Sequence, residues 1–383
     1  MEFLITTAPG LESLVKRECE KIGQNPIEVT DRSVRVEGGF DTLAELNIWL
    51  RCANRVYLVL AEGFATDFDD LFAIAESIDW KKYRPKDAPI LVESVTHKSA
   101  LTSEPAIQRT VKKAIIDSLT RKDGDIIPEI DSLPSFRILV LIREDKATFL
   151  LDSSGDPLHK RGYRQEAGDA PLKETLAAAM IYLSNWRYKE LLVDPSCGSG
   201  TIPIEAAMIA RNIAPGLRRH FAFEDWNWVD PKFLVEAREA GKRKIFPPGS
   251  YQIQGYDIDA EVIEKAVYNS KVAGVATDIT WAVRDMTESP TIESIEKAIG
   301  LGEGATLISN PPYGERLETE DVGVIHTMLA RIFSDHPELS GGVITNESDF
   351  IQKTRRVGLE RRKLFNGSLE CQYCYRKSQR KGK

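Results

Sequence analysis

The sequence has few cysteines and no long apolar segment. Its five cysteines are scattered and odd in number, which argues against a disulfide framework and favours a reducing compartment. No apolar run approaches the roughly 18 residues that cross a membrane. The first residues lack the basic region and the apolar core of a signal peptide. We therefore expect a cytoplasmic protein with no membrane partner.

A cluster of metal ligands is also missing. Cys371 and Cys374 form a CxxC pair, but no second pair accompanies them. Residues three apart in a strand face opposite sides, so these two thiols would not converge on one ion. His97 is isolated from other ligand types. We expect no metal site.

Negative charge outweighs positive charge overall, since the formal net charge is −7, which argues weakly against a nucleic-acid partner. The basic residues are nevertheless concentrated in two regions. Residues 352–383 hold eleven Lys or Arg against two acids, and residues 97–122 hold six against two. Basic surfaces on an acidic chain are compatible with binding of phosphate backbones. For the last six residues a solvated tail is the simpler interpretation.

The first half of the chain has the pattern of a mixed α+β binding module. Strands are expected at residues 3–6, 33–37, 55–61 and 89–95, with a hairpin formed by 136–142 and 147–151. Helices are expected at 11–22, 41–50 and 68–78, and from Glu104 onward. No paired carboxylates, ligand cluster or phosphate loop occurs here, so we expect no reaction centre in this half.

A glycine-rich turn dominates the second half. An apolar strand at 190–193 runs into the turn DPSCGSGT, which begins at Asp194 and is followed by a helix. Glycines such as Gly198 and Gly200 let a ligand approach the backbone. The turn has neither the Lys-Ser/Thr pair of a phosphate loop nor the spacing of a dinucleotide site. Strand, glycine turn and helix together predict the first unit of a doubly wound parallel sheet.

Acidic residues follow the next two predicted strands. Asp257 ends the strand at 252–256, and Asp285 follows the strand at 279–283. The carboxyl ends of parallel strands share one edge, where such sheets bind ligands. Asp194 suits a ligand amino group, Asp257 suits the two ribose hydroxyls and Asp285 suits an adenine amine. Each acid alone is a common strand-end residue, and the series is what indicates a nucleotide-like ligand.

The fourth strand, at 305–309, ends in the tetrapeptide Asn310, Pro311, Pro312 and Tyr313. Two prolines remove two backbone donors and stop the strand ladder. Carbonyl groups and the Asn310 side chain are then free to accept hydrogen bonds beside an aromatic ring. This arrangement suits a planar ring with an exocyclic amine, such as a nucleobase. A loop that is merely rich in proline is the alternative.

Four segments of the first half resemble a THUMP domain preceded by a ferredoxin-like segment: Arg51–Val56, Ser94–Ser99, Phe149–Asp152 and Lys160–Arg164. The resemblance implies an N-terminal ferredoxin-like segment over residues 1–45 and a THUMP domain over 46–155. THUMP domains occur in RNA-modifying enzymes and hold the RNA substrate. This implication agrees with the basic region around residues 97–122.

Residues 156–383 resemble a class I amino-methyltransferase, with the glycine turn as its methionine-binding motif and 310–313 as its [DN]PP[YF] signature. The Asn366-Gly367 pair predicts a hairpin, and an antiparallel hairpin closing a parallel sheet is a feature of that class. The resemblance implies S-adenosylmethionine as cofactor and catalysis by Asn310, Pro311, Pro312 and Tyr313. It implies that the cofactor is bound by Asp194, Cys197, Gly198, Gly200, Asp257, Asp285 and Asn310.

The whole chain resembles the bacterial 23S rRNA guanine-N2 methyltransferase family. The fold expected is therefore α/β, a Rossmann-like domain preceded by the two α+β domains. The resemblance favours rRNA over tRNA as the structured RNA partner. Three alternatives stay open: a tRNA guanine-N2 methyltransferase, an enzyme for adenine N6 or cytosine N4 in RNA or DNA, and a non-catalytic RNA-binding protein.

The segment at 211–250 has two interpretations. Its arginines, Arg218 and Arg219, and its tryptophans, Trp226 and Trp228, suit either contact with RNA or packing on the sheet. We favour packing.

Overall fold

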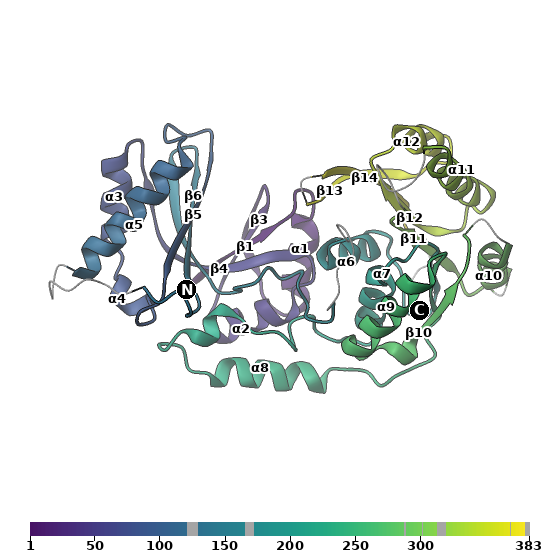
Figure 1. Cartoon of the computed structure of the whole chain (residues 1–383), viewed down its shortest axis with the longest axis horizontal. Coiled ribbons are helices and arrows are strands. Elements are labelled where there is room, and N and C mark those ends of the chain that lie inside the picture. The colour runs from purple at the N-terminus through teal and green to yellow at the C-terminus, as the bar shows by residue number, and fades with distance from the viewer. Residues whose placement is uncertain are drawn as a thin grey trace.

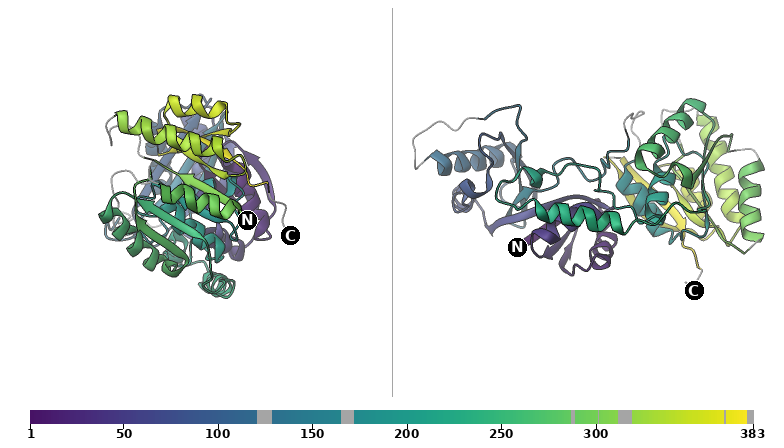
Figure 2. Two further views of the ribbon diagram at one scale, coloured as in Figure 1. Left: turned by 90° about the vertical axis from the view of Figure 1, so that its right-hand side faces the viewer. Right: turned by 90° about the horizontal axis from the view of Figure 1, so that it is seen from below.

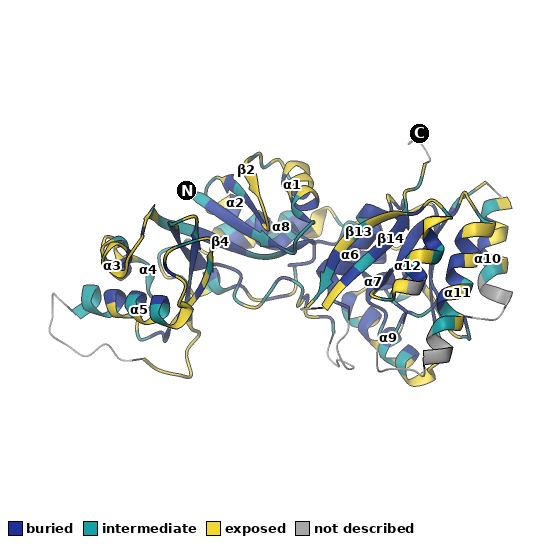
Figure 3. Ribbon diagram, turned by 90° about the horizontal axis from the view of Figure 1, so that it is seen from above, coloured by how far each residue is buried: buried dark blue, intermediate teal, exposed yellow. Residues whose placement is uncertain are grey.

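The computed structural model describes residues 1–120, 129–164, 172–286, 289–300, 302–311, 319–367 and 369–379. Two seven-stranded sheets lie toward opposite ends of an elongated molecule (Figure 1). The first is formed by the N-terminal half and the second by the C-terminal half. Figure 3 shows the buried residues concentrated along the sheets and on the helix faces that cover them. Among the described helices, none is long and apolar enough to pass through a membrane.

The first sheet has the strand order β2-β3-β1-β4-β7-β6-β5. All neighbouring strands are antiparallel except β5 and β6, which are parallel. The elements of this half are β1 (Glu2–Thr7), α1 (Glu12–Lys21), β2 (Pro26–Thr30), β3 (Ser33–Glu37), α2 (Phe40–Trp49), β4 (Ala53–Phe64), α3 (Phe68–Glu76), α4 (Trp80–Tyr83), β5 (Ile90–His97), α5 (Glu104–Thr120), β6 (Phe136–Arg143) and β7 (Lys146–Asp152). The expected strands and helices of this half are confirmed.

One long strand, β4, joins the two parts of this half. Its first residues pair with β1 and its later residues pair with β7. The two domains expected in the N-terminal half therefore share a single sheet. A strand of 12 residues is long enough to serve both partners.

The second sheet has the strand order β10-β9-β8-β11-β12-β14-β13. The first five strands in this order are parallel, and β14 and β13 are antiparallel. The elements are α6 (Glu174–Leu183), β8 (Leu191–Asp194), α7 (Thr201–Ala210), α8 (Lys232–Arg243), β9 (Ile253–Asp257), α9 (Ala260–Ala273), β10 (Ile279–Val283), α10 (Ser289–Gly300), β11 (Ala305–Ser309), α11 (Thr319–Asp335), β12 (Ser340–Thr345), α12 (Ser348–Arg355), β13 (Glu360–Asn366) and β14 (Leu369–Arg376). The parallel sheet with its C-terminal hairpin is confirmed.

The direction of winding changes at β8. The chain goes from β8 outward to β9 and β10, and then returns to β11 on the other side of β8. Such a switch point opens a crevice at the carboxyl ends of the two strands, which is where doubly wound sheets bind ligands. Asp194 and Asn310 therefore lie at the end of neighbouring strands.

The segment at 211–250 packs the two halves together. Helix α8 runs along α2 of the first half (Figures 1 and 2). The Trp228 ring lies 5.7 Å from the Phe40 ring and 5.2 Å from the Tyr83 ring, and it stacks on Trp226 at 4.9 Å. Arg219 points inward and donates to backbone carbonyl groups. These residues pack within the protein, as we favoured, but the expected partner was wrong, because Trp228 contacts α2 and α4 rather than the sheet.

A buried ion pair strengthens the same junction. The Arg161 and Glu205 side chains are 1% and 0% exposed and lie 3.4 Å apart. Arg161 also donates to the Arg51 carbonyl at 2.6 Å, and Arg51 donates to the Ile213 carbonyl at 2.6 Å. The ion pair itself lies within the second half, whereas the two bonds that involve Arg51 cross between the halves and fix their relative position.

Candidate functional site

Asp194 is the last residue of β8 and is almost fully buried at the switch point. Its carboxylate accepts a hydrogen bond of 3.3 Å from the Ser196 amide. Burial raises the pKa of Asp194 well above its usual range, and the neighbouring charge of Asp257 raises it further. A positively charged ligand group at this position would compensate the buried charge. The geometry is therefore suited to the amino group expected from the sequence.

The glycine turn is held by the end of the next strand. The Cys197 amide donates to the Tyr256 carbonyl at 2.8 Å, and the Gly198 amide donates to the Asp257 carboxylate at 2.9 Å. The turn closes through a bond of 2.9 Å from the Gly200 amide to the Cys197 carbonyl. These bonds present the backbone of the turn toward the carboxyl edge of the sheet.

The positions of Gly198 and Gly200 are suited to glycine for different physical reasons. Gly200 has φ +87°, and a Cβ atom there would lie 2.7 Å from the Trp281 ring and 3.0 Å from Ala266. Gly198 has φ +53°, and a Cβ atom there would meet nothing within 4 Å. Gly200 is therefore required for packing, whereas Gly198 faces open space in which a ligand can approach the backbone.

Cys197 is buried beneath this turn. Burial raises the pKa of its thiol well above the usual range, and the charges of Asp194 and Asp257 raise it further. The thiol is therefore neutral near pH 7, and it is not suited to act as a nucleophile. Its amide, rather than its sulfur, is the group that shapes the turn.

Asp257 connects the turn to the third strand. Besides the Gly198 amide, its carboxylate accepts from the Asp259 amide at 3.2 Å, and its carbonyl accepts from the Arg284 amide at 2.8 Å. Each carboxylate oxygen has a second lone pair, so Asp257 retains capacity for ligand hydroxyl groups. Ile258 beside it is 69% exposed and offers an apolar surface at the same edge.

Asp285 lies two residues beyond the end of β10 and is partly buried. Because β10 pairs with β9 in parallel, Asp285 and Asp257 reach the same edge. The structure thus brings Asp194, Asp257 and Asp285 to consecutive strand ends. Their individual contacts with a cofactor stay predictions.

Asn310, which we expect to face the target base, directly follows β11. Its Oδ1 atom is buried and has no hydrogen-bond partner among the described residues. Pro311 beside it is buried. An unpaired buried acceptor costs about 1–3 kcal/mol, and such atoms are rare unless a ligand satisfies them. Pro312 and Tyr313 lie outside the described residues.

Ser196 and Ser309 connect the two sides of the site. Their hydroxyl groups lie 2.6 Å apart, across residues that are 113 positions distant in the sequence. The bond ties the glycine turn to the residue directly before Asn310. Neither serine was identified from the sequence. The signal available was their position beside two strand ends that meet at the switch point.

Arg164 is a second residue that the sequence did not single out for a role. Its guanidinium donates to the Thr201 hydroxyl and to the Leu172 carbonyl, and it lies 3.5 Å from the Glu174 carboxylate. Burial raises the pKa of Glu174, and Arg164 opposes that rise. Since Thr201 opens α7 directly after the glycine turn, Arg164 supports the far end of the turn.

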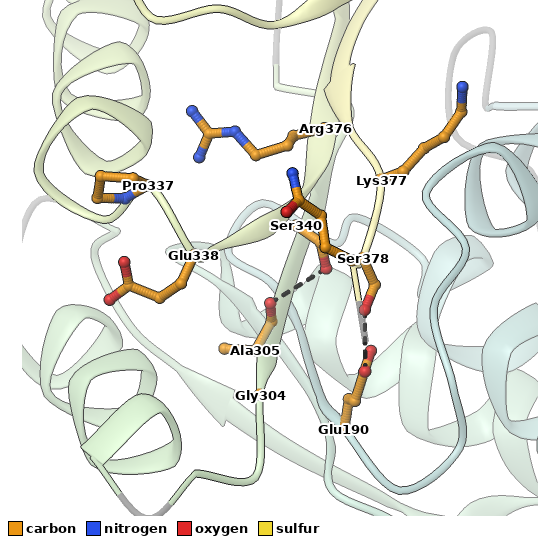
Figure 4. Close-up of a pocket in the computed structure, with 10 residues that line it drawn as sticks. Glu190, Gly304, Ala305, Pro337, Glu338, Ser340, Arg376, Lys377 and Ser378 are labelled. Carbon is orange, nitrogen blue, oxygen red and sulfur yellow. Dashed lines mark hydrogen bonds between the residues drawn. The ribbon is translucent and has the colours of Figure 1, made fainter. Parts of the chain in front are cut away.

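A pocket of about 240 Å³ lies at the opposite edge of the same sheet (Figure 4). It is lined by Ala305 and Ser340 at the amino ends of β11 and β12. Its polar groups are engaged with one another, since Ser378 donates to Glu190 at 3.0 Å and Ser340 donates to the Ala305 carbonyl at 3.2 Å. The predicted acids are not part of this pocket.

The residues at the carboxyl edge fit a cofactor that carries amino and hydroxyl groups. They offer a buried carboxylate, two further acids, an open approach at Gly198 and an unpaired acceptor at Asn310. Over the described ranges, no three His, Cys, Asp or Glu side chains converge to hold a metal ion. A parallel sheet with this turn, these acids and a closing hairpin defines a Rossmann-like class I methyltransferase domain.

Comparison with known families agrees with this class. The model of the RMKL-like methyltransferase domain matches residues 161–374, which is more than half of the chain. The chain belongs to this family. The RlmL ferredoxin-like domain matches residues 2–57, and the THUMP domain matches residues 65–152.

Three relatives cover nearly the whole chain. The "Putative RNA methyltransferase YpsC" of Bacillus subtilis (strain 168) is 36% identical over 97% of this chain and 94% of its own length. The structure of SMU.472, "a putative methyltransferase complexed with SAH", is 35% identical, covers 100% and 99% of the two chains and has a TM-score of 0.85. A "predicted N6-adenine-specific DNA methylase" from Listeria monocytogenes is 36% identical, with coverage of 98% and 96% and a TM-score of 0.85.

Proposed function

We propose that this protein transfers a methyl group from S-adenosylmethionine to the exocyclic N2 of a guanine in structured RNA, with 23S rRNA as the substrate. The observation that carries the proposal is the buried, unpaired Oδ1 atom of Asn310 beside the glycine turn. An amine hydrogen of the target base would satisfy this acceptor. A cytoplasmic location follows from such a substrate.

The matched THUMP domain and the printed name of the Bacillus relative support an RNA substrate. The first half also presents cations that suit a phosphate backbone. Arg109 and Lys113 lie one turn apart on α5, and both are exposed. Lys112 is different, because it forms an ion pair of 3.0 Å with Glu129. Arg121 and Lys122 of the same basic region lie outside the described residues.

Asp194, Asp257 and Asp285, together with the backbone of Gly198, would hold the cofactor. S-adenosylmethionine supplies an electrophilic methyl group on a sulfonium sulfur. The Asp194 carboxylate would accept from the amino group of the methionine moiety, and Asp257 would accept from the ribose hydroxyls. Asp285 would accept from the adenine amine. Cys197 and Gly200 would contribute through the shape of the turn.

The target amine would be positioned by acceptors at the other side of the site. The Asn310 side chain and the Pro311 carbonyl would accept the two amine hydrogens and so direct the nitrogen lone pair toward the methyl group. Correct orientation of this kind supplies a large part of a rate enhancement. The base must leave its stack to reach the site, and Tyr313 is the residue that we expect to stack on it.

No strong general base is required in this mechanism, because the amine proton can leave after the methyl group has been transferred. The neutral thiol of Cys197 agrees with direct transfer, since it excludes that cysteine as a nucleophile. The amine acceptors select a nitrogen and not a particular base. Adenine N6 is therefore the alternative, and the printed name of the Listeria relative points to that activity for that protein.

Mass spectrometry of nucleosides tests the proposal. RNA from cells with and without the gene would be separated into rRNA and tRNA, digested and compared. Loss of N2-methylguanosine from 23S rRNA is the expected result. Loss from tRNA would favour a tRNA enzyme, and loss of N6-methyladenosine would favour the adenine alternative. No change, combined with no binding of S-adenosylmethionine in a titration, would leave a non-catalytic RNA-binding protein.

A further inference from the structure

A groove with basic walls runs between α11 and α12 on the methyltransferase domain. Its volume is about 760 Å³. Both helices lie side by side at the surface, with many exposed residues (Figures 1 and 3). Four of its lining residues are cations and none is an acid: it is lined by Thr327, Ala330, Arg331, Ser334, Gln352, Lys353, Arg355, Arg356 and Val357.

The groove is built on a firm base. Phe333 of α11 and Phe350 of α12 are fully buried beneath it. The Lys353 ammonium group donates to the Thr327 hydroxyl at 2.8 Å, which is a direct link from one helix to the other. The cations above this base are therefore carried by fixed helices, so that ligand binding does not have to order them first.

The three arginines of the groove are accessible to an anionic partner. Within the described part of the chain, the Arg355 and Arg356 guanidinium groups form no ion pair or hydrogen bond, and both residues are exposed. Arg331 has one acid near it, Asp335, at 3.3 Å on the same helix, and both side chains are more than half exposed. Such an exposed pair contributes little and can be exchanged for a phosphate.

The position of the groove relates it to the site. Helix α12 begins three residues after the end of β12, and β12 is the parallel neighbour of β11, which leads to Asn310. Both α11 and α12 thus start near the carboxyl edge and run along the side of the domain toward the opposite edge. A strand that delivers a base to Asn310 can continue along this side.

We propose that this groove binds phosphate groups of the RNA strand that flanks the target nucleotide. The inference rests on the proposed function. It assigns part of the RNA binding to the methyltransferase domain itself, in addition to the THUMP domain. Hydroxyl and amide groups of Ser334 and Gln352 would donate to phosphate or ribose oxygens beside the cations. The surface then contributes affinity and orientation, without selecting a sequence.

The test is the double variant Arg355→Gln/Arg356→Gln in the full-length protein. Binding of a fluorescein-labelled RNA hairpin of mixed sequence would be measured by anisotropy over a range of salt concentrations. Loss of two phosphate contacts should make the dependence of the logarithm of the RNA association constant on the logarithm of salt concentration less steep, by about 1.4 to 2 in the absolute value of the slope. At physiological salt, the affinity should fall roughly tenfold. The affinity for S-adenosylhomocysteine and the melting temperature should not change.

The matched control is Lys242→Gln/Arg243→Gln, which removes two consecutive cations from the last turn of α8. This control should bind RNA with the salt slope of the unmodified protein. An equal loss of RNA affinity in both double variants, or no loss of RNA affinity in the groove variant, would overturn the proposal. Unchanged RNA binding would leave the groove as a surface for an acidic protein. Because binding is measured without catalysis, the outcome is separate from the nucleoside analysis that tests the proposed function.

Discussion

Replacement of Asn310 by alanine separates the catalytic role of this residue from any structural role. The Asn310→Ala variant lacks the acceptor that we assign to the target amine. Removal of one positioned polar group from an active site typically costs about 2.7–4 kcal/mol in the transition state. We therefore expect the rate of methyl transfer at saturating RNA and cofactor to fall about 100- to 1000-fold.

The same change should not destabilise the protein. The Oδ1 atom of Asn310 is buried without a partner in the described structure, and an unsatisfied acceptor of this kind costs about 1–3 kcal/mol. Truncation removes that cost together with a small amount of packing. The free energy of unfolding should stay unchanged or rise by about 1 kcal/mol. Activity and stability thus change in opposite directions, which a merely structural residue would not produce.

The assay is single-turnover transfer of a labelled methyl group, together with chemical denaturation and calorimetric titration with S-adenosylhomocysteine. Cofactor affinity should stay within about threefold of the unmodified protein, because Asp194 and the glycine turn are untouched. Asn310→Asp is the matched control, since it keeps an oxygen acceptor at Oδ1 and should retain more activity than the alanine variant. Near-normal turnover in Asn310→Ala, or a loss of stability that parallels the loss of activity, would refute the reasoning.

Three further predictions concern the cofactor side and the junction. Burial raises the pKa of Asp194, so its carboxylate is lost as the pH falls through that raised value, and calorimetry should show weaker S-adenosylhomocysteine binding at lower pH. The Asp194→Asn variant should bind S-adenosylhomocysteine about 10- to 100-fold more weakly, and its affinity should no longer depend on pH in this way. The same pH dependence of binding in the variant and in the unmodified protein would contradict the assignment. Gly200→Ala should lower the free energy of unfolding by about 2–4 kcal/mol because of its positive φ and the close contacts of a Cβ atom. Gly198→Ala should lower the free energy of unfolding by only about 1 kcal/mol but should weaken binding of the cofactor. A larger loss of stability in Gly198→Ala than in Gly200→Ala, measured by denaturation, would be inconsistent with the geometry. Arg161→Met leaves the Glu205 carboxylate buried without its ion-pair partner and should lower the free energy of unfolding by about 3–5 kcal/mol. An added Glu205→Gln change should recover part of this loss. A loss below about 1 kcal/mol would show that the two side chains are not coupled.

Much of the fold could be predicted because its elements carry strong local signals. Helix α9 begins at Asp259, whose side chain accepts from the Glu261 amide, and it ends at Gly274 in a left-handed conformation. The hairpin of β13 and β14 follows from its Asn-Gly turn. Strand β8 is fully buried and has the continuous apolar pattern of a central parallel strand. In each case the residues needed for the signal are neighbours in the chain.

Other elements were missed, although they carry some local signal. Strand β2 is an edge strand of five residues, and its two alternating apolar residues, Ile27 and Val29, are exposed, so the alternation is too short to reveal it. Helix α8 has a clear apolar face, but its partner is α2, nearly 200 positions earlier in the chain. The sequence could predict that Trp228 is buried against the protein, and it could not predict that Phe40 and Tyr83 receive it. Long-range partners are set by the fold as a whole.

The site shows the same division between local and long-range information. The acids at the strand ends could be predicted, since each follows its own apolar run. The contact between the glycine turn and the end of β11 could not be predicted, because it depends on the bond between Ser196 and Ser309. That bond links the turn expected to hold the methyl donor with the residue directly before the amine acceptor, Asn310. The tetrapeptide to which we assign catalysis would acquire its function from this place at the switch point, since the same residues at another strand end would only terminate a strand.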